Sequence, residues 1–291
     1  MKYSISNIAW EKEYDGEMYS FLKENGVDGI EIAPTRIFEN PYDRLEEAHL
    51  YSYMLKNKYG LTVSSMQSIW YGIGQNIFGT DEDRRFLTDY TKKAVLFAES
   101  MGIKNLVFGC PKNRNVPQGA NTDIALEFFK QIGDFAFEHG TNIALEPNPV
   151  IYNTNFLNYT KDCCEFVKKV DSKGLKVNID MGTMIYNKEN PHLVKTYKTL
   201  VNHIHISYPN LEYIKPCGEY TTLKKVLGKI DYEGYISIEM KKQDDIQKVK
   251  DAVLYVKGAF YCYIKIFGAC RILNVKNMPK KRQSIVCVFQ S

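Results

Sequence analysis

The chain has 291 residues, of which 44% are hydrophobic and 25% charged, so it can bury the core of one domain of about 250 residues. It contains no run of 18 apolar residues, which argues against a membrane span, and it begins without the apolar stretch of a signal peptide. The net charge of +4 misleads, because residues 258–291 hold six basic side chains and no acidic one. The remainder has 32 of the 38 basic residues against all 34 acidic ones, a balance of −2 that excludes a strongly basic nucleic-acid-binding body.

Short apolar strands alternate with amphipathic helices along the first 258 residues. Strands are predicted over residues 3–9, 28–33, 61–67, 103–108, 142–146, 175–180, 203–207 and 235–239. Helices are predicted over residues 15–25, 42–59, 80–101, 121–139, 158–170, 191–200, 246–257 and from 221 to about 227; the third opens at a capping box, Thr80 to Asp83.

Eight such units predict a parallel sheet closed into a (β/α)8 TIM barrel, an α/β fold, over residues 1–258. The alternative, an open doubly wound sheet, lacks its glycine-rich phosphate-binding fingerprint after the first strand. Residues 259–291 do not continue the repeat and are predicted to form an irregular basic tail outside the barrel. The seven cysteines are odd in number and include no C-x-x-C pair, which is typical of reduced thiols and predicts a cytoplasmic protein.

Four of the predicted strands end on a residue type that binds metals: Glu146, Asp180, His205 and Glu239. The carboxyl ends of the strands of a barrel meet at one mouth, so these side chains are expected to converge there. Three carboxylates and one imidazole suit Mn²⁺, Mg²⁺ or Co²⁺, and zinc also accepts such a set. The sequence therefore predicts one divalent metal ion, which could polarise a substrate carbonyl and stabilise an enediolate.

These strand ends resemble those of the xylose isomerase-like barrels, the sugar (phosphate) isomerase and epimerase group. The resemblance covers residues 1 to about 258 and depends on Leu145-Glu146-Pro147, residues 178–183, His203-Ile204-His205 and Ser237-Ile238-Glu239. It implies that Glu146, Asp180, His205 and Glu239 bind the metal and that the two glutamates also serve as the acid/base pair. It further implies a cytoplasmic enzyme of carbohydrate metabolism.

The chain departs from the ketose 3-epimerases of this group at three positions around the substrate. Thr183 stands where they have a histidine, Leu211 where they have an arginine and Tyr152 where they have a second glutamate. The metal ligands therefore match the group, while the substrate-contacting residues differ. The related apurinic endonucleases hold a three-metal cluster with many histidines, and the five histidines of this chain disfavour that alternative.

Other residues beside the strand ends are candidates for binding a small-molecule substrate. They comprise aromatic rings that could wall a sugar, polar groups that could bind hydroxyls, and cations that could bind a phosphate: Trp10, Glu31, Arg36, Trp70, Lys112, Arg114, Asn148 and His203. For each of them, ordinary core or loop packing is the alternative interpretation.

The most specific interpretation is a metal-dependent isomerase or epimerase of a sugar or sugar phosphate, working by proton transfer through an enediolate. A metal-dependent polyol dehydratase on the same barrel and a non-catalytic sugar-binding barrel are the alternatives. No nucleic-acid or membrane partner is expected, and assembly into a homo-oligomer is compatible with the sequence.

Overall fold

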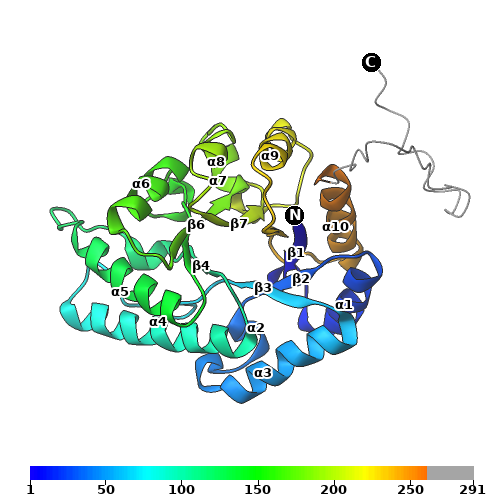
Figure 1. Cartoon of the computed structure of the whole chain (residues 1–291), viewed down its shortest axis with the longest axis horizontal. Helices are drawn as coiled ribbons and strands as arrows, with labels where there is room; N and C mark the ends of the chain where they lie inside the picture. Colours follow the sequence, from blue (N-terminus) through cyan, green and yellow to red (C-terminus); the bar gives the residue numbers. More distant parts are fainter. Residues whose placement is uncertain (261–291) are drawn as a thin grey trace, which may run out of the picture. The chain divides into compact units, whose positions relative to one another are not determined.

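The computed structural model describes residues 1–260, in which eight parallel strands close into a barrel with helices around it (Figure 1). Each strand pairs with its neighbour in the sequence, and the pairing of β1 with β8 closes the ring. The strands are β1 (Lys2–Ser6), β2 (Gly29–Ile32), β3 (Thr62–Met66), β4 (Leu106–Phe108), β5 (Ile143–Leu145), β6 (Leu175–Asp180), β7 (Val201–Ile206) and β8 (Tyr235–Ile238). The predicted TIM barrel is therefore confirmed.

Ten α-helices connect or extend these strands within the described residues. They are α1 (Asp15–Glu24), α2 (Pro34–Ile37), α3 (Leu45–Met54), α4 (Asp81–Met101), α5 (Ile124–Glu138), α6 (Thr160–Val170), α7 (Met181–Tyr186), α8 (Leu193–Thr196), α9 (Gly218–Lys229) and α10 (Ile246–Phe260). Short 3₁₀ turns are η1 (Asn7–Ala9), η2 (Lys12–Tyr14), η3 (Pro41–Asp43), η5 (Pro111–Arg114), η6 (Val150–Tyr152) and η7 (Pro209–Leu211), and η4 (Leu55–Tyr59) is a π-helical turn.

Two predicted elements are shorter in the structure, and two short helices, α2 and α7, were not predicted. The first strand ends at Ser6, because the Ser6 hydroxyl accepts a hydrogen bond from the Ile8 backbone and starts a 3₁₀ turn. The helix predicted over residues 191–200 is reduced to α8. The signal for α7 is present in the sequence, since Asp180 precedes it and accepts a hydrogen bond from the Thr183 backbone as a helix cap.

Polar side chains fill part of the barrel interior. Glu31 of β2 contacts His203 and His205 of β7, although β8 and β1 separate these strands in the sheet. All three side chains are buried, so the contact crosses the inside of the ring. An apolar core lies between the strands and the helices. Alternate strand residues, such as Ile5 and Ile30, belong to it. The barrel therefore presents a polar column that leads to its mouth.

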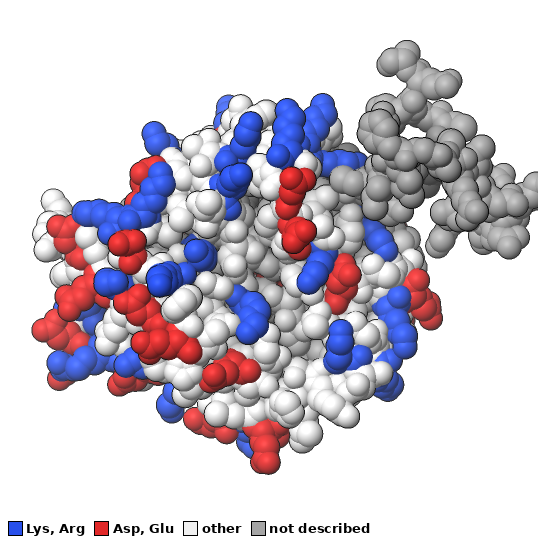
Figure 2. Space-filling view, in the orientation of Figure 1, with Lys and Arg blue, Asp and Glu red and all other residues white. Residues whose placement is uncertain are grey.

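No helix within residues 1–260 has the length and apolar character needed to cross a membrane. Basic and acidic side chains are interspersed over the face drawn in Figure 2. The four cysteines of the described part of the chain, Cys110, Cys163, Cys164 and Cys217, are free thiols. The cytoplasmic location stays a prediction.

The last described helix reaches beyond the predicted barrel boundary at residue 258. α10 includes Phe260, whose ring is buried and lies 6.4 Å from the ring of Tyr220 on α9. The rest of the predicted tail, residues 261–291, lies outside the described residues, and its separation from the barrel stays a prediction.

A chain truncated after Phe260 should keep the melting temperature of the full-length protein, because α10 completes the helical ring. The variant Phe260→Ala leaves a cavity in the core, which should reduce the free energy of unfolding by about 3 kcal/mol. For a protein of this size, the melting temperature should then fall by about 6–12 °C. Thermal unfolding followed by circular dichroism compares the three chains. A truncated chain that melts as low as Phe260→Ala would place the tail in the fold.

Candidate metal centre

Four potential ligand residues converge at the carboxyl end of the barrel. Asp180 ends β6, His205 lies near the end of β7, and Glu146 and Glu239 directly follow β5 and β8. One ligand atom from each lies within 4.8 Å of those of the other three, and all four residues are buried. The convergence predicted from the strand ends is thus present in the structure.

His205 stands at the centre of this group. Its Nδ1 atom lies 2.8 Å from a carboxylate oxygen of Glu146 and 3.0 Å from one of Glu239. Nδ1 is buried and lies between these two carboxylates, which are its nearest charged neighbours. The other ring nitrogen, Nε2, lies 3.0 Å from Glu31 Oε2.

The contact with Glu31 places a proton on one ring nitrogen of His205. Glu31 as a carboxylate can only accept a hydrogen bond, so Nε2 carries the proton and donates it. Nδ1 faces the carboxylates of Glu146 and Glu239, whose charges favour a proton on it, and a bound cation would take the place of that proton. A ring whose outer nitrogen donates to a carboxylate while its inner nitrogen offers a lone pair is the usual state of a metal-binding histidine.

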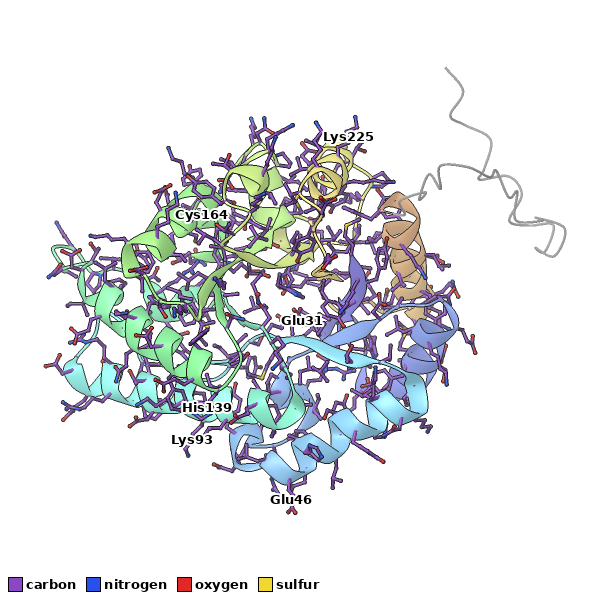
Figure 3. The ribbon with its side chains drawn as sticks, in the orientation of Figure 1. Glu31, Glu46, Lys93, His139, Cys164 and Lys225 are labelled. Atoms are coloured by element: carbon purple, nitrogen blue, oxygen red, sulfur yellow. The ribbon has the colours of Figure 1, made fainter. Side chains whose placement is uncertain are left out.

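Glu31 is held from several sides inside the barrel, where Figure 3 labels it at the centre of the ring of strands. His203 Nε2 lies 3.1 Å from its Oε2 atom, and the Gln67 side-chain amide donates to its Oε1 atom at 3.2 Å. Gln67 also donates to the Ser6 hydroxyl at 2.6 Å. The strand-2 carboxylate is therefore a fixed part of the barrel interior, directly behind His205.

The Glu146 side chain is positioned by Asn178 on β6 and by residues of the loops that follow β4 and β5. Asn178 of β6 donates to its Oε1 atom at 2.7 Å, and Asn148 donates to Oε2 at 3.3 Å. Gly109 leaves room for it, since a Cβ atom there would lie 3.0 Å from Oε2. The buried guanidinium of Arg114 donates from Nη1 to the Glu146 backbone carbonyl at 2.9 Å.

Asp180 is held by hydroxyl and backbone groups rather than by a cation. The Ser207 hydroxyl donates to its Oδ1 atom, and the Thr183 backbone donates to Oδ2 at 2.6 Å. The Thr183 hydroxyl lies 2.7 Å from the same Oδ2. Thr183, which replaces the histidine of the 3-epimerases, thus orients a potential ligand instead of extending toward a substrate.

Burial and mutual repulsion shape the charges of the group. Burial, reinforced by the charge of Glu146, raises the pKa of Asp180 to about 6. Burial likewise raises the pKa of Glu239, against the attraction of His205. Burial alone would lower the pKa of His205, but the charges of Glu239 and Glu31 outweigh it and hold that pKa well above its usual value. A divalent cation among these oxygens would offset the repulsion, so the donor set fits such an ion.

A cavity of about 160 Å³ opens beside the group. It is lined by Gln67, Ser68, Val107, Gly109, Cys110, Pro111, Glu146, Asn148, Tyr152, Asp180, Leu211 and Glu239. Sequence reasoning missed Gln67, Ser68, Gly109 and Cys110 as lining residues, because each follows a strand without carrying a side chain typical of metal or phosphate sites. Leu211 and Tyr152, which depart from the 3-epimerase pattern, both line this cavity.

Several predicted substrate-binding residues do not line this cavity, because other partners hold them. Trp10 is buried and its indole nitrogen donates to Asp15 at 2.8 Å, while Arg36 pairs with the same carboxylate at 2.6 Å. Arg114 is buried behind Glu146, and His203 and Glu31 lie inside the barrel. Of the eight candidates, Asn148 lines the cavity; Trp70 and Lys112 line an adjoining one.

Residues 19–258 match the family described as Xylose isomerase-like TIM barrel. Among solved structures, 3-keto-D-glucoside 4-epimerase from E. coli is 20% identical with a TM-score of 0.71, covering 89% of this chain and 99% of its own. D-Psicose 3-epimerase from Clostridium cellulolyticum H10 is 17% identical with a TM-score of 0.70, covering 90% and 100%. A family 2 AP endonuclease from Brucella melitensis is 16% identical with a TM-score of 0.69, covering 88% and 98%. These likenesses establish the fold. No curated protein sequence matches the chain.

The variant Glu239→Gln should stabilise the protein in the presence of a chelator. It keeps the size of the side chain and removes one buried negative charge. Because folding raises the pKa of Glu239, its ionised form costs folding free energy above that pKa. The cost disappears below about pH 4, where the carboxyl is protonated in both states. We expect a gain of about 0.5–2 kcal/mol at pH 8, or about 1–8 °C in melting temperature, and none at pH 4.

The matched control is Glu46→Gln on the exposed surface of α3, where Figure 3 labels Glu46 at the edge of the molecule. A surface change of this kind should stay within about 0.5 kcal/mol. Scanning calorimetry at the two pH values measures both variants. Destabilisation by Glu239→Gln at pH 8 would mean that the charge is already compensated within the protein.

Proposed function

Because the chain belongs to the xylose isomerase-like TIM barrel family, we propose that it is a divalent-metal-dependent isomerase or epimerase of a sugar or sugar phosphate. The observation that carries this proposal is the buried group of Glu146, Asp180, His205 and Glu239, whose potential ligand atoms all lie within 4.8 Å of one another. The epimerases of known structure that share the fold support it.

Glu146, Asp180, His205 and Glu239 would hold the ion. Three carboxylates and one imidazole match the preference of Mn²⁺, Mg²⁺ or Co²⁺ for hard oxygen donors, with zinc a further candidate. When bound, such an ion polarises a substrate carbonyl and so acidifies the neighbouring C–H group. The site's own side chains supply the remaining functions.

Glu146 and Glu239 are the candidate acid/base pair. They approach His205 from β5 and β8, so a substrate carbon in the cavity would have a carboxylate on either side. One carboxylate removes the proton beside the carbonyl, and the other returns a proton to the opposite face, which inverts the carbon. Return by the same carboxylate to the adjacent carbon would give an isomerase. Cys110 also lines the cavity, but burial raises the pKa of its thiol to about 12, which makes it a poor base.

Glu31 and Asn178 have positioning roles in this proposal. Glu31 keeps a proton on Nε2 of His205, and Asn178 turns one oxygen of Glu146 toward the centre of the group. Trp10, Arg36 and His203 are not proposed to contact the substrate. Trp10 and Arg36 bind Asp15, and His203 lies beside Glu31.

Two alternatives use the same barrel. A polyol dehydratase would share the metal and the first proton abstraction, and it differs by expelling water from the carbon next to the enediolate. An endonuclease would need a basic face and further metal ligands. The interspersed charges of Figure 2 favour a small-molecule substrate over a nucleic acid, and the second convergent group within residues 1–260, Glu31, His203 and His205, shares His205 with the first.

Glu146→Gln and Glu239→Gln should each lower kcat by about 10²–10⁴-fold, because each removes one proton-transfer group. The two losses should not add in the double variant, since either change interrupts the same relay. Solvent deuterium incorporation into a panel of keto-sugars in D₂O, read by NMR at saturating Mn²⁺ with bound metal verified, measures the step. Normal turnover by one of the two variants would exclude the two-base mechanism and favour a single-base isomerase.

Glu31→Gln should weaken Mn²⁺ binding by about 10–100-fold, the usual effect of losing the carboxylate behind a metal-binding histidine. Isothermal titration calorimetry of the protein without any sugar measures the dissociation constant. Glu46→Gln serves as the surface control and should bind as the unchanged chain does. If Glu31→Gln bound Mn²⁺ as tightly as the unchanged chain, the hydrogen bond from His205 to Glu31 would not contribute to metal binding.

A further inference from the structure

We infer that the substrate carries a second sugar ring, which lies in a cavity adjoining the candidate metal centre. This inference deepens the proposed function and depends on it. The reacting keto-sugar would occupy the cavity of about 160 Å³ beside Glu146 and Glu239, and the second ring would occupy a neighbouring cavity of about 480 Å³.

The two cavities share a wall. Ser68, Cys110 and Pro111 line both of them, so the two cavities adjoin at these residues, and a two-ring ligand would have to reach across them. The neighbouring cavity is otherwise lined by residues of the loops that follow β3 and β4: Trp70, Tyr71, Gly72, Ile73, Lys112 and Asn113. The loops that close the first cavity thus also form the second.

The shared wall is built from strained but well-supported turns. Ser68 has a φ of 54° and Cys110 a φ of 42°, both in the left-handed region that non-glycine residues seldom adopt. Such conformations persist where the surrounding structure holds them, and they concentrate at ligand-binding sites. Both turns bend the chain immediately after a barrel strand and so separate the loop walls from the metal centre.

The second cavity is preformed by hydrogen bonds between its two loops. The Asn113 side chain donates to the backbone carbonyls of Ile73 at 2.9 Å and Gln75 at 2.8 Å. The Ile77 backbone donates to the Asn113 carbonyl at 2.9 Å. The indole nitrogen of Trp70 donates to Thr91 at 2.9 Å, which fixes that ring. A ligand entering this cavity therefore meets walls that need little ordering.

The chemistry of the lining favours a neutral ring. Tyr71 is 71% exposed, and its ring offers a face against which the C–H groups of a sugar can pack. No lysine or arginine lines the first cavity, and Lys112 is the one cation of the second. Arg36 and Arg114, the other cations predicted to bind phosphate, are held by Asp15 and by the Glu146 carbonyl. A phosphate would therefore find a single lysine, whereas a second ring finds an aromatic wall and a hydrogen-bonding rim.

The test compares two matched pairs of keto-sugars: D-fructose with isomaltulose, and 3-keto-D-glucose with 3-ketosucrose. In each pair the second member is the same reacting unit joined to another ring. D-fructose 6-phosphate is included as the phosphorylated arm. Deuterium incorporation from D₂O at the carbon beside the carbonyl gives kcat and KM for the Mn²⁺-loaded full chain. We expect the two-ring member of at least one pair to have the higher kcat/KM.

Tyr71→Ala should raise the KM of the preferred two-ring sugar by about 3–10-fold, the value of one aromatic contact, and should change the one-ring member less. Tyr71→Phe keeps the ring and should restore the KM. Tyr53→Ala, on an exposed tyrosine of α3 that lines neither cavity, is the matched control. Unchanged melting temperatures verify that the variants are folded.

The outcomes separate the inference from the proposed function. If no sugar of the panel exchanges its proton, the proposed function is wrong and the inference falls with it. If one-ring sugars react at least as well as their two-ring partners and Tyr71→Ala affects both alike, the proposed function stands and the second-ring site is wrong. Preference for D-fructose 6-phosphate, lost in Lys112→Met, would also overturn the inference and assign the second cavity to a phosphate.

Discussion

The contact between Glu31 and His205 is the interaction on which the candidate site depends. It joins β2 to β7 through the interior of the barrel and leaves Nδ1 of His205 pointing at Glu146 and Glu239. Buried carboxylates without a counter-charge are costly. Here the cost is reduced on one side by two imidazoles around Glu31, whose charges and hydrogen bonds lower its pKa against the effect of burial. On the other side, Asp180 and Glu239 have raised pKa values and repel each other, as groups do where a cation is expected.

The barrel can accommodate this polar column because small and hydroxyl-bearing residues stand inside it. Ser6 and Gln67 connect Glu31 to the strand-3 end, and Asn178 connects the interior to Glu146. These groups bond to one another through side chains, so the interior is ordered by hydrogen bonds as well as by packing. The same hydrogen bonds hold these side chains in defined positions, as the proposed proton transfer would require.

The substitutions that separate this chain from the 3-epimerases change the cavity in a consistent direction. Leu211 and Tyr152, which the resemblance places where those enzymes have an arginine and a glutamate, both line the cavity. Thr183 withdraws from the substrate side to bind Asp180. The ligand group is thus retained while the surrounding wall becomes less charged. This agrees with a substrate recognised through ring faces and hydroxyls rather than through ionic contacts.

The sequence by itself determined the barrel and the four converging ligand residues. Strand and helix periodicities depend on local residue order, and the ends of parallel strands must meet at one mouth whatever the loops do. It could not determine which nitrogen of His205 faces the carboxylates, that Glu31 lies behind that ring instead of in the substrate cavity, or that Arg36 and Trp10 share Asp15. These facts depend on contacts between residues far apart in the chain, such as Glu31 and His205, 174 positions apart. Only closure of the ring brings such partners within hydrogen-bonding distance, so the tertiary structure alone decided which polar residues line the cavity and which are held inside the barrel.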